Sequence, residues 1–181
     1  MAAVARRGGV EGGVGGELFG GRIERVHLAT GKVETLYREC NGHALRGPND
    51  IVFDKHGGFY FTDLGKVRHT DMDRGGVFYS DTAGNHPKVV AHPAMTPNGV
   101  ALSPDGRTLY FYNGRGAFVG LSFSSGPDGK PQLGAERTLY NRGYVRNWTM
   151  SPDGSSLIFI DTARLLRLLG LEVVLNLQPG S

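Results

Sequence analysis

The sequence has few features that would mark a secreted or membrane-bound protein. Its 181 residues include one cysteine, Cys40, so no disulfide can form within the chain. Free cysteine is typical of a reducing compartment, and we expect a cytoplasmic location. No apolar run reaches the ~20 residues of a membrane-spanning helix. The first 20 residues are rich in glycine and lack the continuous apolar region of a secretory signal, so we expect no membrane partner.

The sequence also has only a small excess of positive over negative charge. The 20 lysines and arginines are interspersed among 17 acidic residues and leave a net charge of +3. A nucleic-acid-binding surface needs clustered basic residues, so we expect no nucleic-acid partner. The sequence also lacks a Gly-x-Ser-x-Gly nucleophile motif, a His-Glu-x-x-His zinc motif and a phosphate-binding loop. These absences argue against serine hydrolases, zinc proteases and nucleotide-binding enzymes.

What the sequence does contain is a repeat. Phe61 and Phe111 occupy the same place in two copies, 50 positions apart, and Phe159 follows 48 positions later. Each copy has two apolar runs separated by a glycine-containing turn, such as Asp-Gly at 105–106 and 153–154. Asp-Gly supplies the positive φ angles of a tight hairpin. A repeat of this length, built from short strands, is typical of a β-propeller with one four-stranded blade per copy.

The repeat predicts an all-β protein, a partial β-propeller of about three to four blades of four antiparallel strands. The propeller region is predicted over residues 21–162, beginning with an outer strand pair and ending with an inner hairpin. Residues 1–20 are expected to be a disordered N-terminus, and residues 163–181 an atypical apolar tail. Single-chain propellers close with ~4–8 blades, so we expect an incomplete ring.

Two asparagines open the inner strands of successive copies. Asn49 and Asn98 each follow a proline at the same point of the repeat. The innermost strands of a propeller line its central channel, so equivalent residues would contribute to one ring of side chains. Amide oxygens bind Ca²⁺ alongside carboxylates and water. Pro-Asn is also an ordinary turn opener, because proline fixes φ and asparagine tolerates the left-handed region. From the residues alone, both interpretations stay open.

Four segments resemble the SMP-30/gluconolactonase/LRE family: residues 47–54, 59–63, 73–77 and 96–106. The resemblance implies a six-bladed propeller that hydrolyses a small-molecule lactone with one divalent metal ion, usually calcium. It implies that Asn98 is a metal ligand and that Asn49 is a metal ligand or a substrate contact. Asp50 and Asp63 are then the nearest candidate catalytic carboxylates, which would help to deliver water to the lactone carbonyl.

The sequence departs from the family where the acidic metal ligands are expected. A later aspartate is expected near position 147, where the sequence has Asn147, and Glu11 lies too close to the strand at residue 21 to be the first-blade glutamate. Asn49, Asn98 and Asn147 would form a neutral metal site, so we expect calcium binding to be impaired. The alternative is a non-catalytic propeller module for binding, in which the asparagines only form turns.

Sugar-lactone members of the family often carry an arginine two residues before the asparagine of the Pro-Asn-Asp motif. The residue at that place is Gly47. The sequence therefore predicts a lactone or related ester as the substrate, and does not favour a sugar lactone in particular.

Overall fold

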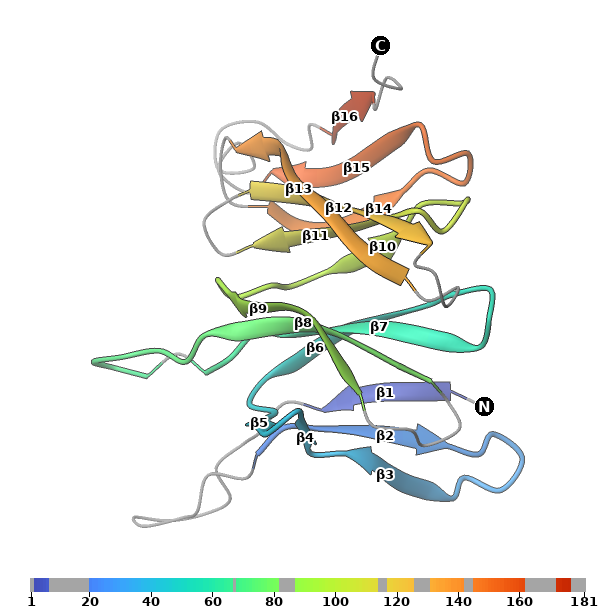
Figure 1. The fold of residues 1–181 in the computed structure, drawn as a ribbon, viewed down its shortest axis with the longest axis vertical. Helices are drawn as coiled ribbons and strands as arrows, with labels where there is room; N and C mark the ends of the chain where they lie inside the picture. Colours follow the sequence, from blue (N-terminus) through green and yellow to red (C-terminus); the bar gives the residue numbers. More distant parts are fainter. Residues whose placement is uncertain are drawn as a thin grey trace. The chain divides into compact units, whose positions relative to one another are not determined.

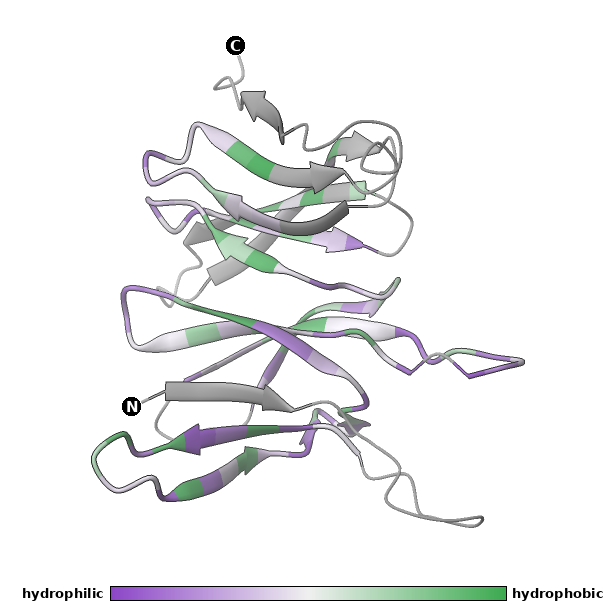
Figure 2. Cartoon of the chain, turned by 180° about the vertical axis from the view of Figure 1, so that it is seen from behind, coloured by the Kyte–Doolittle hydropathy of each residue, from purple (hydrophilic) through white to green (hydrophobic). Residues whose placement is uncertain are grey.

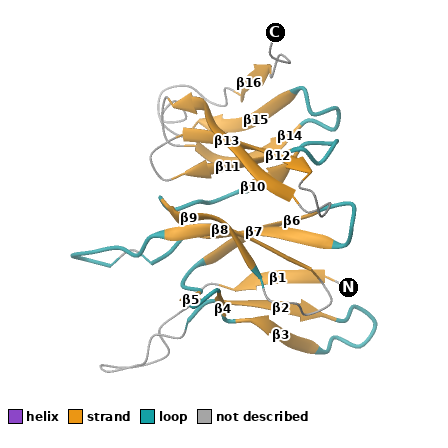
Figure 3. Ribbon diagram, in the orientation of Figure 1, coloured by secondary structure: helices purple, strands orange, loops and turns teal. Residues whose placement is uncertain are grey.

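The computed structural model describes residues 2–6, 20–66, 68–81, 87–113, 117–125, 131–141, 145–161 and 172–176. All the regular structure in these ranges is β-strand, as the repeat predicted (Figure 3). Within the same ranges, no helix has the length and apolar character needed to cross a membrane. The chain divides into two compact units, Met1–Val100 and Ala101–Ser181.

The first unit contains two main antiparallel sheets and a short hairpin (Figure 1). One sheet has the order β1-β2-β3, the second has the order β6-β7-β8-β9, and β4 pairs with β5. The bounds are β1 (Ala2–Arg6), β2 (Arg22–Val26), β3 (Val33–Tyr37), β4 (Glu39–Cys40), β5 (His43–Ala44), β6 (Pro48–Phe53), β7 (Gly58–Asp63), β8 (Gly75–Asp81) and β9 (Lys88–Ala94). The four-stranded sheet is the first of the whole blades that the repeat predicted.

The second unit contains one four-stranded and one three-stranded sheet, in the orders β10-β11-β12-β13 and β14-β15-β16. The bounds are β10 (Val100–Leu102), β11 (Thr108–Asn113), β12 (Ala117–Ser125), β13 (Pro131–Asn141), β14 (Val145–Met150), β15 (Ser156–Asp161) and β16 (Glu172–Asn176). Strand β10 begins at the last residue of the first unit. Its sheet is the second whole blade, and β14 with β15 is the predicted inner hairpin.

Two strands lie in segments for which we expected no blade structure. Ala2–Arg6, in the N-terminal segment expected to be disordered, forms β1 and pairs antiparallel with β2. Glu172–Asn176, in the apolar tail, forms β16 and pairs antiparallel with β15. Both segments are short and lack an Asp-Gly turn, so neither shows the sequence pattern of the repeat. Each gains its backbone hydrogen bonds by extending a neighbouring hairpin.

The hairpin turns have the geometry that their sequences predict. Gly106 and Gly154 have φ angles of 75° and 73°. In each turn a serine hydroxyl donates to the following aspartate, from Ser103 to Asp105 at 2.6 Å and from Ser151 to Asp153 at 2.5 Å. The two copies of the repeat therefore use the same turn chemistry, and the repeat is structural as well as sequential.

The core of the first unit is built around β7. Every residue of β7 is buried, including the aromatic rings of Phe59, Tyr60 and Phe61. An inner strand covered on both faces needs apolar side chains at successive positions, and this run supplies them. Phe61 stacks on Phe78 of β8 with ring centroids 5.3 Å apart. Figure 2 shows apolar residues along the strands and hydrophilic residues in the long loop between β7 and β8. The C-terminal end of this buried strand carries Thr62 and Asp63.

Candidate functional site

A β-bulge lies where the Pro-Asn-Asp motif enters β6. Pro48 pairs with Asp63 and Ile51 pairs with Phe61, so Asn49 and Asp50 together face a single residue of β7, Thr62. Bulges of this kind are common beside active sites, because the extra residue redirects the side chains around it. Proline contributes to the irregularity, since it has no backbone N–H to donate to the neighbouring strand.

The carboxylate of Asp50 holds two backbone amides. Its Oδ1 accepts a 2.9 Å hydrogen bond from the N–H of Ile51, and its Oδ2 accepts one of 2.9 Å from the N–H of Val100. The side chain is half-buried. Asp50 therefore connects the Pro-Asn-Asp motif to the end of the Pro-Asn-Gly motif, both within the first unit.

Thr62 makes a second connection between the same two motifs. Its hydroxyl accepts a 3.2 Å hydrogen bond from the N–H of Asp50 and donates one of 2.6 Å to the carbonyl oxygen of Asn98. Thr62 is fully buried, with 0% of its surface exposed. Sequence reasoning did not select this residue. The signal that could have found it is a hydroxyl one position before Asp63, directly after three aromatic residues of the same strand.

The hydrogen bonds of Asp50 and Thr62 do not use the side-chain amides of Asn49 and Asn98. Asn49 and Asn98 are half-buried, and within the part of the chain that the structure describes neither side chain has a hydrogen-bond partner. The backbone around each asparagine is held by Asp50 and Thr62, so the network fixes the chain and leaves the amide groups unoccupied. Their predicted roles, metal ligand for Asn98 and metal ligand or substrate contact for Asn49, stay predictions.

Asp63 occupies a different environment from Asp50. It is 4% exposed, and its carboxylate accepts hydrogen bonds from the backbone N–H groups of Arg46 and Gly47 at 2.7 Å each and of Gly65 at 2.8 Å. Such a carboxylate fixes two loops, the one that enters β6 and the one that leaves β7. The geometry favours a structural role, and the predicted catalytic role of Asp63 stays untested.

The backbone around Asp63 is packed too closely to accept side chains. A Cβ atom placed on Gly47 would lie 2.4 Å from the carbonyl oxygen of Gly65. Gly65 itself has a φ of 74°, which favours glycine, and a Cβ there would lie 2.6 Å from the carbonyl oxygen of Asp73. Position 47 therefore holds glycine for a steric reason, and an arginine could not occupy it without a shift of the backbone.

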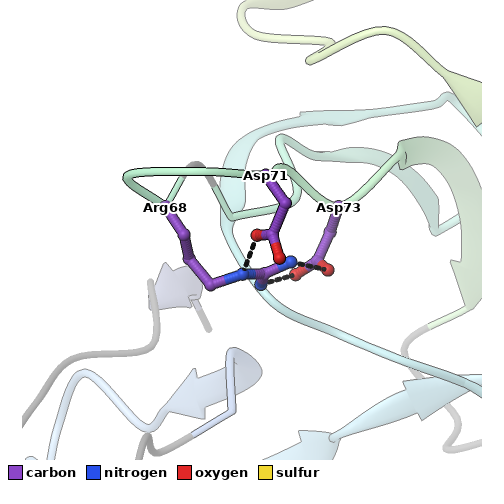
Figure 4. Close-up of polar contacts among 3 residues, drawn as sticks. All are labelled: Arg68, Asp71 and Asp73. Atoms are coloured by element: carbon purple, nitrogen blue, oxygen red, sulfur yellow. Dashed lines mark hydrogen bonds and ion pairs between the residues drawn. The ribbon is translucent and has the colours of Figure 1, made fainter.

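The loop that follows Asp63 is folded around one arginine, Arg68 (Figure 4). Its guanidinium contacts Asp71 through Nε and binds both carboxylate oxygens of Asp73, at 3.0 and 2.9 Å. The hydrogen bonds from Arg68 lower the pKa of Asp73. These three residues were missed by sequence reasoning, although the Arg-x-x-Asp-x-Asp spacing could have indicated them. The cluster is exposed, and it pins a loop rather than forming a cavity.

Asn147 lies at a bulge as well, in the second unit. Arg146 pairs with Ile160 and Trp148 pairs with Phe159, so Asn147 is the extra residue of β14. The backbone position is thus similar to that of Asn49 in β6, at the start of the first strand of its sheet. The structure does not describe the Asn147 side chain, and its predicted role as a metal ligand stays a prediction.

Asn49 and Asn98 have the side-chain chemistry of calcium ligands. Their amide oxygens are hard ligands of the kind that calcium accepts, and neither has a hydrogen-bond partner among the described residues. Across the described residues, no group of three histidine, cysteine, aspartate or glutamate side chains is arranged to hold a metal. The two nearby carboxylates, Asp50 and Asp63, already hold backbone amides. The two amide oxygens are therefore chemically suitable for calcium, but as ligands they supply no negative charge.

Comparison with known sequences decides the family. Residues 4–157 match the sequence profile described as the SMP-30/Gluconolactonase/LRE-like region. The chain belongs to this family. It is similar to a gluconolactonase of Zymomonas mobilis, with 33% identity over 98 residues that make up 50% of this chain and 27% of the relative. It is also similar to the lactonase drp35 of Staphylococcus epidermidis, with 37% identity over 62 residues, 34% of this chain and 18% of the relative.

Solved structures agree with the fold. A gluconolactonase from Xanthomonas campestris, XC5397, superposes with a TM-score of 0.61 at 24% identity, over 76% of this chain and 48% of that chain. A putative gluconolactonase superposes with a TM-score of 0.57 at 20% identity, over 76% of this chain and 49% of that chain. These propeller structures confirm the partial β-propeller. The chain spans about half of their length and 27% of the Zymomonas relative.

Proposed function

We propose that this chain is part of a lactone hydrolase of the gluconolactonase type, with a small-molecule lactone as substrate. One observation carries the proposal: the Pro-Asn-Asp and Pro-Asn-Gly motifs are joined by hydrogen bonds through Asp50 and Thr62, while the side-chain amides of Asn49 and Asn98 have no hydrogen-bond partner among the residues that the structure describes. A turn role alone needs neither the connection nor the free amides. The similarity to a gluconolactonase and a lactonase supports the same reaction class.

Asn98 and Asn49 would hold a divalent metal ion, most simply Ca²⁺, through their amide oxygens. A metal ion bound there would polarise the carbonyl group of the lactone. Both ligands are neutral, and each missing charge pair at ~4 Å weakens attraction by ~1 kcal/mol in water and by ~4 kcal/mol at an effective dielectric of 20. We therefore propose calcium binding on the order of millimolar affinity, and hydrolysis weaker than that of a site with carboxylate ligands.

Asp50 is the better candidate for the catalytic base. A carboxylate has about four acceptor positions, and two of those on Asp50 hold the amides of Ile51 and Val100. The half-buried side chain therefore keeps the capacity to accept a hydrogen bond from an attacking water molecule and then its proton. Asp63 accepts three amides and is 4% exposed, so we assign it the positioning of the loops around the site.

A second candidate function is a non-catalytic binding module. It is favoured by the small number of charged metal ligands. Among the described residues, no three acidic, histidine or cysteine side chains lie together in a way that could hold a metal ion. In this case the same asparagines would serve the backbone only. The two functions differ in one respect that can be measured, which is the opening of a lactone ring.

Acid release from glucono-1,5-lactone in weak buffer, corrected for spontaneous opening, tests the proposal. We expect slow hydrolysis that rises with added calcium chloride, is lost in Asn98→Ala and falls at least about tenfold in Asp50→Asn. Asn41→Gly is the matched control, because Asn41 is an exposed asparagine whose φ of 52° suits glycine. Hydrolysis that is equal in all four proteins would contradict the proposal, and no hydrolysis above background would favour the binding module.

A further inference from the structure

We infer that Thr62 is a positioning residue: together with Asp50 it fixes the backbone that carries Asn98, and so sets the place of the Asn98 amide. The inference rests on the proposed function, because it assigns Asn98 to the binding site. Thr62 itself makes no contact with a substrate or metal in this account. It acts through the main chain of a neighbouring segment.

The bulge interrupts the regular pairing between β6 and β7. In a regular antiparallel pair, the backbone of Thr62 would pair with one residue of β6, but the bulge places Asn49 and Asp50 opposite it. The N–H of Asp50 is therefore directed to the hydroxyl of Thr62, at 3.2 Å. The hydroxyl replaces a backbone acceptor that the bulge has removed.

The hydroxyl of Thr62 donates its hydrogen bond to the segment that carries Asn98. A threonine hydroxyl has one hydrogen to donate, and here it goes to the carbonyl oxygen of Asn98 at 2.6 Å. Thr62 is 0% exposed, so no solvent reaches this group to satisfy it instead. The bulged motif and the Asn98 backbone are thus held by a single buried hydroxyl, and neither bond can be replaced by bulk water.

A second hydrogen bond, accepted by Asp50, holds the same segment. Asn98 is fixed through its carbonyl oxygen by Thr62, and Val100 is fixed through its N–H by Asp50. Only Gly99 lies between them, and glycine is the residue with the greatest backbone freedom. Without these two bonds the segment could take many conformations, so the bonds restrict the positions that the Asn98 amide can reach.

Thr62→Val tests the inference, because valine keeps the shape of threonine and removes the hydroxyl. Thr62→Ser is the matched control, because it restores the hydroxyl on a smaller side chain. Two quantities are measured: the exchange rate of the Val100 amide hydrogen by NMR, and the midpoint of a titration with calcium chloride followed by thermal unfolding. We expect Thr62→Val to speed Val100 exchange and to raise the calcium midpoint by about tenfold each, the size of effect of one ordinary hydrogen bond, and Thr62→Ser to restore most of both.

The outcomes separate this inference from the proposed function. Unchanged Val100 exchange in Thr62→Val overturns the inference, whatever calcium does. Faster exchange with an unchanged calcium midpoint overturns it too, if Asn98→Ala in the same titration weakens binding. A wild-type chain that does not respond to calcium, or an Asn98→Ala variant that responds to calcium as the wild type does, contradicts the proposed metal site. The exchange rates then decide whether Thr62 holds the segment. If Thr62→Val does not fold, Thr62→Ser must keep most of the wild-type protection of the Val100 amide, and an exchange rate raised by about tenfold in Thr62→Ser overturns the inference.

Discussion

The carboxylate of Asp50 accepts a 2.9 Å hydrogen bond from the backbone N–H of Val100, although the two residues lie 50 positions apart in the sequence. That separation is one repeat of the propeller pattern. An aspartate that follows Asn49 thus holds the backbone two residues after Asn98, the equivalent asparagine of the next copy. The repeat brings together the two motifs that the proposed function uses.

Asp50→Ala tests how much this connection stabilises the chain. The change leaves the amides of Ile51 and Val100 without their acceptor. An unsatisfied buried amide costs about 1–3 kcal/mol, and we expect the free energy of unfolding in urea to fall by about 2–4 kcal/mol. Asp105→Ala, which removes an exposed turn aspartate, should cost less. A smaller loss for Asp50→Ala than for Asp105→Ala would contradict the connection.

The strands and turns could be predicted from the sequence because they depend on local patterns. Asp-Gly pairs gave positive-φ glycines at 106 and 154, and the aromatic run at 59–61 gave a buried strand. The hydrogen bonds of Thr62 could not be predicted in this way. They depend on a bulge of one residue in β6 and on the contact of Thr62 with Asn98, 36 positions later in the sequence. Neither feature can be recognised from the pattern of apolar residues.

The candidate site was predicted only in part, because some of its features depend on local sequence patterns and others on contacts between distant residues. Asn49 and Asn98 were found because the motif repeats in the sequence. The different environments of Asp50 and Asp63 depend on which backbone amides surround each carboxylate, and loop geometry decides that. The steric reason for Gly47 likewise appears only once the carbonyl oxygen of Gly65 is placed beside it.

Asp63→Asn separates a loop-fixing role from a catalytic one. The asparagine amide keeps one acceptor oxygen and places an NH₂ group against one of the three backbone donors, Arg46, Gly47 and Gly65. We expect a loss of about 2–4 kcal/mol in the free energy of unfolding, measured with urea, because hydrogen bonds to a charged group are the stronger kind. A variant with wild-type stability and abolished lactone hydrolysis would assign Asp63 to catalysis instead.

Gly65→Ala tests the close packing beside Asp63, and Gly31→Ala provides a matched control. Both glycines have positive φ, 74° and 69°, but only Gly65 has a neighbouring carbonyl oxygen at the place of the new Cβ. The backbone cost alone is about 1–2 kcal/mol for either change. We therefore expect thermal unfolding to show a larger loss for Gly65→Ala, and equal losses would show that the loop can move away from the clash.

His92 should make stability depend on pH. Burial lowers the pKa of His92 below its ordinary value of 6.5, and the adjacent His43 ring, whose centroid is 4.1 Å away, lowers the pKa further, while Asp63 raises it. As the pH falls below about 6.5, the unfolded chain takes up the proton first, so this contribution to stability is lost on acidification. It is fully present above that pH.

Thermal unfolding between about pH 7.5 and 5 measures this effect. We expect His92→Phe, which keeps an aromatic ring beside Phe78, to lose less stability on acidification than the wild type. His56→Gln, at an exposed turn position, should behave as the wild type does. Parallel pH profiles for the wild type and His92→Phe would show that His92 is not the titrating group.

Calcium titration calorimetry of the wild type, Asn98→Ala and Asn98→Asp tests the central claim most directly, which is that neutral asparagine amides form a weak cation site in a lactonase-family chain. We predict a dissociation constant on the order of millimolar for the wild type, no binding by Asn98→Ala, and binding at least about tenfold tighter for Asn98→Asp, because a carboxylate adds the charge that the site lacks. One calcium affinity shared by all three proteins would contradict the claim.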